Sequence, residues 1–160
     1  MAIGIRRCLF IGLGGTGMDA LLHTKKLFME TYGEVPPMIG FLGIDTNRNQ
    51  YNVSLDSSVG KIELVNSEQY AILPNNPMPT YNANKSHFNW LPDSNIVSLT
   101  TLNGAGAGQV RTNGRFCLTQ HFGHLKNKIR NAVTAITNAS IINNEKYKLL
   151  SNNVEIHLVF

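Results

Sequence analysis

Residues 11–17, Ile-Gly-Leu-Gly-Gly-Thr-Gly, stand directly after an apolar run and directly before a segment with helical spacing of apolar residues. Glycine reaches positive φ at little cost and lets a ligand approach the backbone closely. The helix that follows such a turn directs free N–H groups and the positive end of its dipole toward the same point. The spacing G-x-G-x-x-G, placed between a strand and a helix, therefore predicts a cradle for the phosphates of a nucleotide.

The segments on either side of this turn predict a βαβ unit. Residues 6–12 and 38–44 are largely apolar, which is typical of strands whose sheet is covered on both faces. Residues 16–31 carry apolar side chains near helical spacing, and the pair Pro36-Pro37 follows that helix. Two such strands joined by a helix lie parallel, with a right-handed crossover. The predicted fold is α/β, a Rossmann-like parallel sheet with helices on both faces.

The middle of the chain is richer in loops. We expect a polar loop at 47–60, a short strand at 61–65, and a long Pro- and Asn-rich loop at 73–95 with one short helix near residues 84–90. A second glycine turn follows at 103–108, with the sequence Asn-Gly-Ala-Gly-Ala-Gly. Because it precedes a segment with helical periodicity, it predicts a second turn-to-helix junction.

The last third of the chain predicts a long helix at 109–138 and a buried strand at 154–160. The apolar stripe of the helix consists of Leu118, Phe122, Leu125, Ile129, Val133 and Ile136. His157 lies within the strand, and we expect it to be a core histidine. A buried parallel strand rarely closes a chain, so we expect residues 1–160 to be a single N-terminal domain segment cut from a longer protein.

Composition limits the classes of protein that need to be considered. With 160 residues, 42% of them hydrophobic, one domain can bury a core without disulfides, and Cys8 is expected to be a reduced buried thiol. The net charge of +4 is mild and the basic residues are scattered, so a nucleic-acid partner is disfavoured. No run approaches the ~20 apolar residues of a membrane span, and we expect a cytoplasmic protein without one.

Two glycine turns and an acidic residue at a strand end can converge on one ligand, because such turns lie together outside the carboxyl ends of parallel strands. The first turn would contact phosphates through backbone N–H groups, the second would reach a terminal phosphate, and the residues after the second strand would face phosphate or ribose. These candidate binding residues are Gly12, Gly14, Gly15, Thr16, Gly17, Asp45, Thr46, Asn47, Gly104, Ala105, Gly106, Ala107 and Gly108.

Other chemistry stays open at this point. The chain lacks G-x-x-x-x-G-K-[ST], so no P-loop lysine is present, whereas a Rossmann-type enzyme domain using NAD, FAD or ATP would place Asp45 near the ribose. Cys117, His121 and His124 share a helix face, where they could bind zinc or, less readily, pair a nucleophile with a base. Trp90 is expected to anchor the long loop, or else to form a contact patch with its neighbours.

Three stretches, in order, resemble a known family. Residues 10–17 are similar to the first phosphate loop, 41–47 to the second strand and its loop, and 103–108 to the γ-phosphate-sensing loop of the tubulin/FtsZ superfamily, in particular of the bacterial tubulin-like family. Arg115, after a glycine, falls where that family has a Gly-Arg near the nucleotide. Thr112 stands where FtsZ has a ribose-contacting Glu.

The resemblance implies a tubulin/FtsZ GTPase-type domain that binds GTP, with Mg²⁺ accompanying the nucleotide, and that self-associates. The strand at 154–160 resembles the one that leads into the signature loop of the superfamily, and neither that loop nor the guanine-recognising helix is within the 160 residues. Guanine specificity and hydrolysis are therefore not carried over to this segment. We expect any GTPase activity to belong to the longer parent protein.

Overall fold

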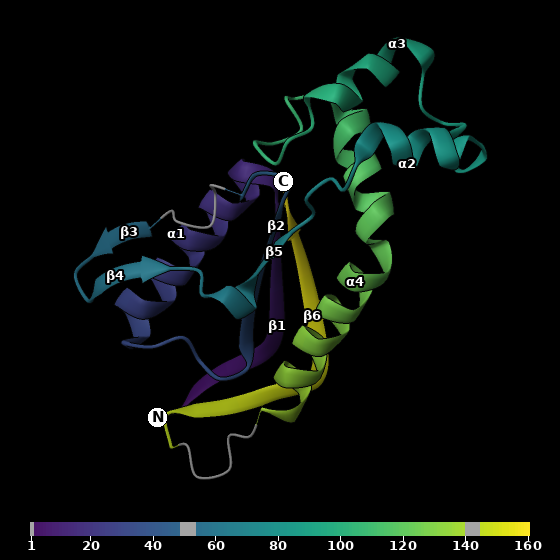
Figure 1. Cartoon of the computed structure of the whole chain (residues 1–160). Helices are drawn as coiled ribbons and strands as arrows, with labels where there is room; N and C mark the ends of the chain where they lie inside the picture. The colour runs from purple at the N-terminus through teal and green to yellow at the C-terminus, as the bar shows by residue number, and fades with distance from the viewer. Residues whose placement is uncertain (1, 49–53, 140–144) are drawn as a thin grey trace.

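A four-stranded parallel sheet forms the centre of the molecule (Figure 1). The computed structural model describes residues 2–48, 54–139 and 145–160. The strands lie in the order β5-β2-β1-β6, and each neighbouring pair is parallel. Their bounds are Ile3–Leu13 for β1, Ile39–Asp45 for β2, Gln69–Ala71 for β5 and Tyr147–Val159 for β6.

Helices cover opposite faces of this sheet, because side chains alternate between the two faces along each strand. The helix α1 (Gly14–Tyr32) packs Leu21 against one face, in a cluster with Phe41 of β2. The helix α4 (Arg111–Asn138) packs Ile136 against the other face, in a cluster with Leu9 and Leu42. The predicted α/β fold, a Rossmann-like parallel sheet with helices on both faces, is confirmed.

The order of the strands creates a reversal point in the sheet. The chain leaves β1 toward β2 and β5 on one side, and α4 then carries it back across the sheet to β6 on the other side. In open α/β sheets, ligands bind outside the carboxyl ends of the strands at such a point. The turn from β1 into α1 stands at that edge, next to the end of β2 (Figure 1).

A two-stranded hairpin lies outside the main sheet. It consists of β3 (Ser54–Ser57) and β4 (Gly60–Glu63), which pair antiparallel. Lys25 and Lys26 of α1 hold it by donating to backbone carbonyls of Glu63 and Asp56 at 2.9 and 2.8 Å. The expected loop at 47–60 therefore contains a strand where it is described. The strand expected at 61–65 belongs to this hairpin, and β5 is the one that extends the main sheet.

The segment between β5 and α4 is more helical than its composition indicates. The 3-10 turn η2 (Asn66–Glu68) directly precedes β5. After β5 come the short helices α2 (Pro77–Ala83), η3 (Lys85–Phe88), α3 (Asp93–Ile96) and η4 (Val97–Thr101). The expectation of a long loop with one short helix is wrong. Phe88 and Leu99 are buried, and the centres of the Phe88 ring and the Phe116 ring on α4 lie 4.7 Å apart. Tertiary contacts therefore order this segment.

The apolar stripe expected on α4 is correct only in its C-terminal half. Leu125 and Ile136 are buried, but Leu118 is 38% exposed and Phe122 is 63% exposed. The N-terminal half of α4 buries Phe116 and Cys117 instead, because this half packs against the short helices and not against the sheet. Helical periodicity identifies an apolar face, but the neighbour of each helical turn decides which residues are covered.

The last strand also differs from expectation. β6 begins at Tyr147, earlier than predicted, and it pairs only with β1 among the described strands. The His157 side chain is 47% exposed, so the prediction of a core histidine is wrong, and Cys8 is only partly buried. Both differences have one cause: β6 is the outer strand of the described sheet, so His157 on it and Cys8 beside it on β1 have fewer neighbours.

Candidate functional site

The first glycine turn combines tight packing with an open face. A Cβ atom on Gly12 would lie 2.4 Å from the carbonyl oxygen of Gly17, and one on Gly17 would lie 2.7 Å from that of Val159. These two glycines are therefore required for the close approach of α1 to β1 and β6. Gly14 has φ of 70° and open space around it, so it supplies the turn itself.

The N-terminus of α1 carries no side-chain cap. Leu13 occupies the N-cap position without a capping hydrogen bond, and the first turn has no acidic side chain. Gly15 is partly buried and Thr16 is exposed. The first N–H groups of a helix have no partner within the helix, and an uncapped terminus with its positive dipole end favours an anion.

The loop after β2 is built around a buried carboxylate. Asp45 and Thr46 are 7% and 8% exposed, and Oδ1 of Asp45 accepts a hydrogen bond from the backbone N–H of Asn47 at 2.9 Å. The register of β1 and β2 pairs Leu13 with Ile44, so this loop begins beside the first glycine turn. The carboxylate of Asp45 therefore shapes the loop from within.

The second glycine turn lies against the same loop. Asn47 forms an antiparallel bridge with Ala105, and the N–H of Arg48 donates to the carbonyl oxygen of Gly104 at 2.9 Å. The turn repeats positive φ at alternate residues, 89° at Gly104, 111° at Gly106 and 62° at Gly108. A hollow of about 270 Å³ lies between Arg48 and residues 103–105. The loop after β2 thus lies between the two predicted turns.

Asn113 supports the second turn and was not among the predicted site residues. Its side chain is 1% exposed, and its Nδ2 donates to the carbonyl oxygen of Ala107 at 3.3 Å. Its Oδ1 accepts from Oγ of Ser98 at 2.8 Å. An asparagine on the first turn of a helix is a weak signal by itself, because nothing local distinguishes a buried amide from a solvated one.

Arg115 is held by the segment before α4. Its guanidinium lies 4.1 Å from the centre of the Trp90 ring, a cation–π contact. Thr112 accepts a hydrogen bond from Nδ2 of Asn95 at 2.8 Å. Trp90 does anchor the segment, as expected. The contact accounts for the position of the Arg115 side chain, and its role near a nucleotide stays a prediction.

The residues considered for zinc on α4 already have other partners. Cys117 is fully buried in the core, where burial raises the pKa of its thiol to about 11. The Nε2–H of His121 donates to the carbonyl oxygen of Leu73 at 2.6 Å, which leaves Nδ1 to accept from the Tyr70 hydroxyl at 3.1 Å. Both ring nitrogens are thereby occupied, so this geometry does not support metal binding or a nucleophile–base pair with Cys117.

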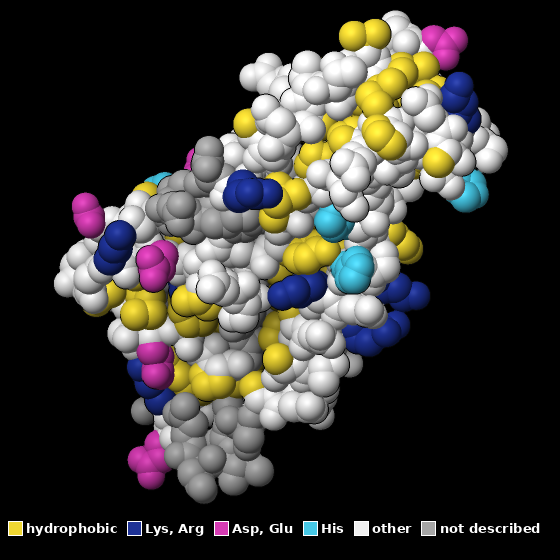
Figure 2. Space-filling view, in the orientation of Figure 1, with side chains coloured by type: hydrophobic (Ala, Val, Ile, Leu, Met, Phe, Trp, Pro, Cys, Tyr) yellow, Lys and Arg dark blue, Asp and Glu magenta, His cyan; other side chains and the backbone are white. Residues whose placement is uncertain are grey.

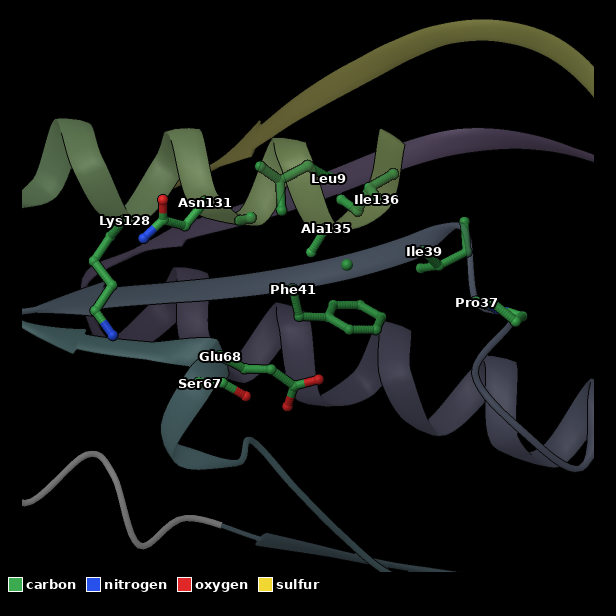
Figure 3. A pocket seen from close by; sticks show the side chains of 12 residues that line it. Leu9, Pro37, Ile39, Phe41, Ser67, Glu68, Lys128, Asn131, Ala135 and Ile136 are labelled. Carbon is green, nitrogen blue, oxygen red and sulfur yellow. The ribbon is translucent and has the colours of Figure 1, made fainter. Parts of the chain in front are cut away.

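A larger hollow lies elsewhere, at the flank of β2. Its volume is about 380 Å³, and it opens because β5 pairs only with the last three residues of β2. Figure 3 shows Lys128 and Asn131 bordering it from α4, and Ser67 and Glu68 bordering it from η2. Glu68 accepts from Nζ of Lys25 at 2.6 Å. This hollow lies beside the N-terminal half of β2, away from the glycine turns, and follows from the short length of β5.

The surface gives two further observations. Figure 2, in the orientation of Figure 1, shows Lys and Arg side chains spread over the visible face of the molecule, with one group over α4. Among the helices of residues 2–48, 54–139 and 145–160, none is long and apolar enough to cross a membrane.

Comparison with known proteins gives one match. A family model described as tubulin like matches residues 9–160. This range includes both glycine turns, the loop after β2, and all of α4 and β6. No curated protein and no solved structure matches the chain significantly.

Proposed function

The chain belongs to the tubulin-like family, and from this premise we propose that its two glycine turns bind the phosphates of GTP. The observation that carries the proposal is the bridge between Asn47 and Ala105. It fixes the second turn against the loop that begins beside the first turn. Two turns that are separated by about ninety residues of sequence, as their numbers show, thus border one edge of the sheet.

The backbone geometry suits an anion. The uncapped N-terminus of α1 offers N–H donors, and a Cβ atom on Gly14 or Gly108 would meet nothing within 4 Å. A Cβ on Gly106 would have Asn47 as its neighbour, at 3.8 Å. We assign the inner phosphates to the first turn and the terminal phosphate to the second. The loop at Asp45 would face the ribose or the phosphates.

Mg²⁺ is part of the proposal as a companion of the nucleotide. It commonly binds through phosphate oxygens, waters and one or two carboxylates. Asp45 is the carboxylate at the end of β2, where the loop beside the first turn begins, and its Oδ1 already accepts the N–H of Asn47. We therefore expect the phosphates to supply most of the ligands to the ion. Phosphoryl transfer depends mainly on the positioning of the phosphates and the stabilisation of their charge. The proposal therefore needs no catalytic side chain from this segment.

Self-association is the second part of the proposal. Among the described strands, β6 pairs with β1 on one side only, and an outer strand is a template for pairing with another chain. Ile156 and Leu158 on β6 are 50% and 56% exposed. We therefore expect this edge to favour dimers or strand exchange.

Binding of NAD, FAD or ATP is the alternative function. The strand order β5-β2-β1-β6 matches the first four strands of a dinucleotide-binding sheet, in which an acidic residue after the second strand contacts the ribose. Asp45 occupies that position at the end of β2. This alternative gives the second glycine turn no required role, which is why GTP is preferred.

The test measures binding of GTP, ATP and NAD to the full chain by calorimetry, with the variant Gly106→Asp. We expect GTP to bind, and Gly106→Asp to lower its affinity at least tenfold because the new carboxylate would face phosphate. Gly60→Asp is the matched control: Gly60 also has φ of 111° and open space, but lies in the β3–β4 hairpin. ATP or NAD binding without GTP binding would favour the alternative, and equal losses in both variants would contradict the site.

A further inference from the structure

Three side chains with metal-binding atoms lie together where β1 pairs with the outer strand β6. They are Cys8 of β1 and Glu155 and His157 of β6, and their ligand atoms all lie within 4.8 Å of one another. In the parallel register, Cys8 pairs with Glu155 and Phe10 pairs with His157. Because residues two apart on a strand share a face, the register itself brings the three side chains together.

Two of the three ligand side chains are oriented by neighbours. The His157 imidazole stacks on the Phe10 ring, with centres 5.0 Å apart and an angle of 20° between planes. Oε1 of Glu155 accepts a hydrogen bond from Arg6 at 2.6 Å, while Oε2 lies 3.7 Å from Nε2 of His157. The carboxylate therefore has one oxygen held by Arg6 and the other directed toward the histidine.

This arrangement leaves two electron-pair donors facing each other. When the imidazole is neutral, its Nε2 can accept and the Glu155 oxygen can only accept, so a cation between them would satisfy both. The third donor is the sulfur of Cys8. A thiol binds a metal as the thiolate, so binding at Cys8 would release its proton.

We propose that Cys8, Glu155 and His157 bind a divalent cation of the zinc class. Thiolate, imidazole and carboxylate are the ligands that zinc takes in proteins, and three of them leave a fourth tetrahedral position for water. Partial exposure of His157 gives that position access to solvent. Arg6 would remain bonded to Oε1 as an outer partner, which is a common arrangement for ligating carboxylates.

This site is independent of the nucleotide proposal. Cys8 lies five residues before the end of β1 at Leu13, on the face that α1 covers, whereas the glycine turns lie beyond the ends of the strands. The two proposals therefore fail separately. Loss of cation binding would leave GTP binding intact, and the reverse also holds.

The test is a titration of the full chain with Co²⁺, which substitutes for zinc and gives a near-ultraviolet charge-transfer band when a thiolate binds it. We expect one Co²⁺ per chain, displacement of Co²⁺ by Zn²⁺, and loss of the band in Cys8→Ser. His157→Gln should weaken binding at least about tenfold, since even outer-sphere partners of a metal typically contribute 10–100-fold.

Two matched controls identify the ligands. Cys117→Ala removes the other thiol, which is buried in the core, and His124→Gln removes an exposed histidine outside the cluster. Both variants should keep the charge-transfer band with unchanged affinity. The proposal is overturned by absence of the band at saturating Co²⁺, by a band that survives Cys8→Ser, or by unchanged affinity in His157→Gln.

Discussion

Gly12 and Gly14 stand two residues apart, but different forces require glycine at each. At Gly12 the limit is space, because the backbone of Gly17 occupies the volume that a Cβ would need. At Gly14 the limit is conformation, because φ is 70° and the surroundings are open. A single sequence motif thus contains a packing glycine and a turn glycine, and only the second lies where a ligand could approach.

Substitution of Gly12 tests the packing role. We expect Gly12→Ala to lower the free energy of unfolding by about 1–3 kcal/mol, the usual cost of overpacking, because both closest atoms belong to backbone that cannot move aside cheaply. Gly123→Ala is the control, on the exposed side of α4 with nothing within 4 Å, and should stabilise the chain by up to ~1 kcal/mol. Urea unfolding measures both, and a neutral Gly12→Ala would contradict the close approach.

At the scale of the element, α4 changes its neighbours along its length. Its C-terminal half packs against the sheet through Leu125 and Ile136, and its N-terminal half packs against the short helices through Phe116. The part of its apolar stripe nearest the N-terminus is left uncovered. Phe122, together with Leu118 and Leu158 of β6, lines an apolar groove that also contains residues from the ends of β1 and β2.

Two phenylalanines of α4 form a matched pair that tests this description. Phe116 is fully buried and Phe122 is 63% exposed, six residues further along the same helix. We expect Phe116→Ala to lower the free energy of unfolding by about 3–5 kcal/mol, and Phe122→Ala to change it by less than about 0.5 kcal/mol. Denaturant unfolding of both variants measures the difference, and equal effects would mean that Phe122 is covered in solution.

At the scale of the whole molecule, the outer strand and the apolar groove lie on the same side of the sheet. Ile156 and Leu158 of β6 pair with Leu9 and Ile11, which face α4, and both β6 side chains are half exposed. An outer strand beside an apolar surface combines backbone pairing with hydrophobic burial for an incoming partner. This combination supports the proposed self-association.

Sedimentation equilibrium over a range of concentrations tests self-association. We expect the average mass to rise with concentration, and Leu158→Lys to shift the chain toward monomer because a charge would be buried at the new contact. Leu27→Lys is the control, since Leu27 is 65% exposed on α1, outside the groove. A monomer at every concentration would contradict the prediction, and so would an equal effect of the two variants.

Sequence alone determined the features that depend on neighbours along the chain. Strand–turn–helix order, the glycine turns and the length of α4 follow from local periodicity and backbone freedom, and the matched tubulin-like family spans the same stretches. The binding roles of the turns stay predictions. The short strand β5 and the helices before α4 could not be predicted in this way. Long-range contacts, such as that of Phe88 with Phe116, stabilise them, and no strong local pattern marks them.

Only the tertiary structure decided which distant residues meet. The bridge between Asn47 and Ala105, and the cluster of Cys8 with Glu155 and His157, each join segments that the sequence keeps far apart. Their pairing depends on sheet order and register, and a shift of one residue would turn each side chain to the opposite face. Register is a property of two strands together, so neither strand encodes it alone.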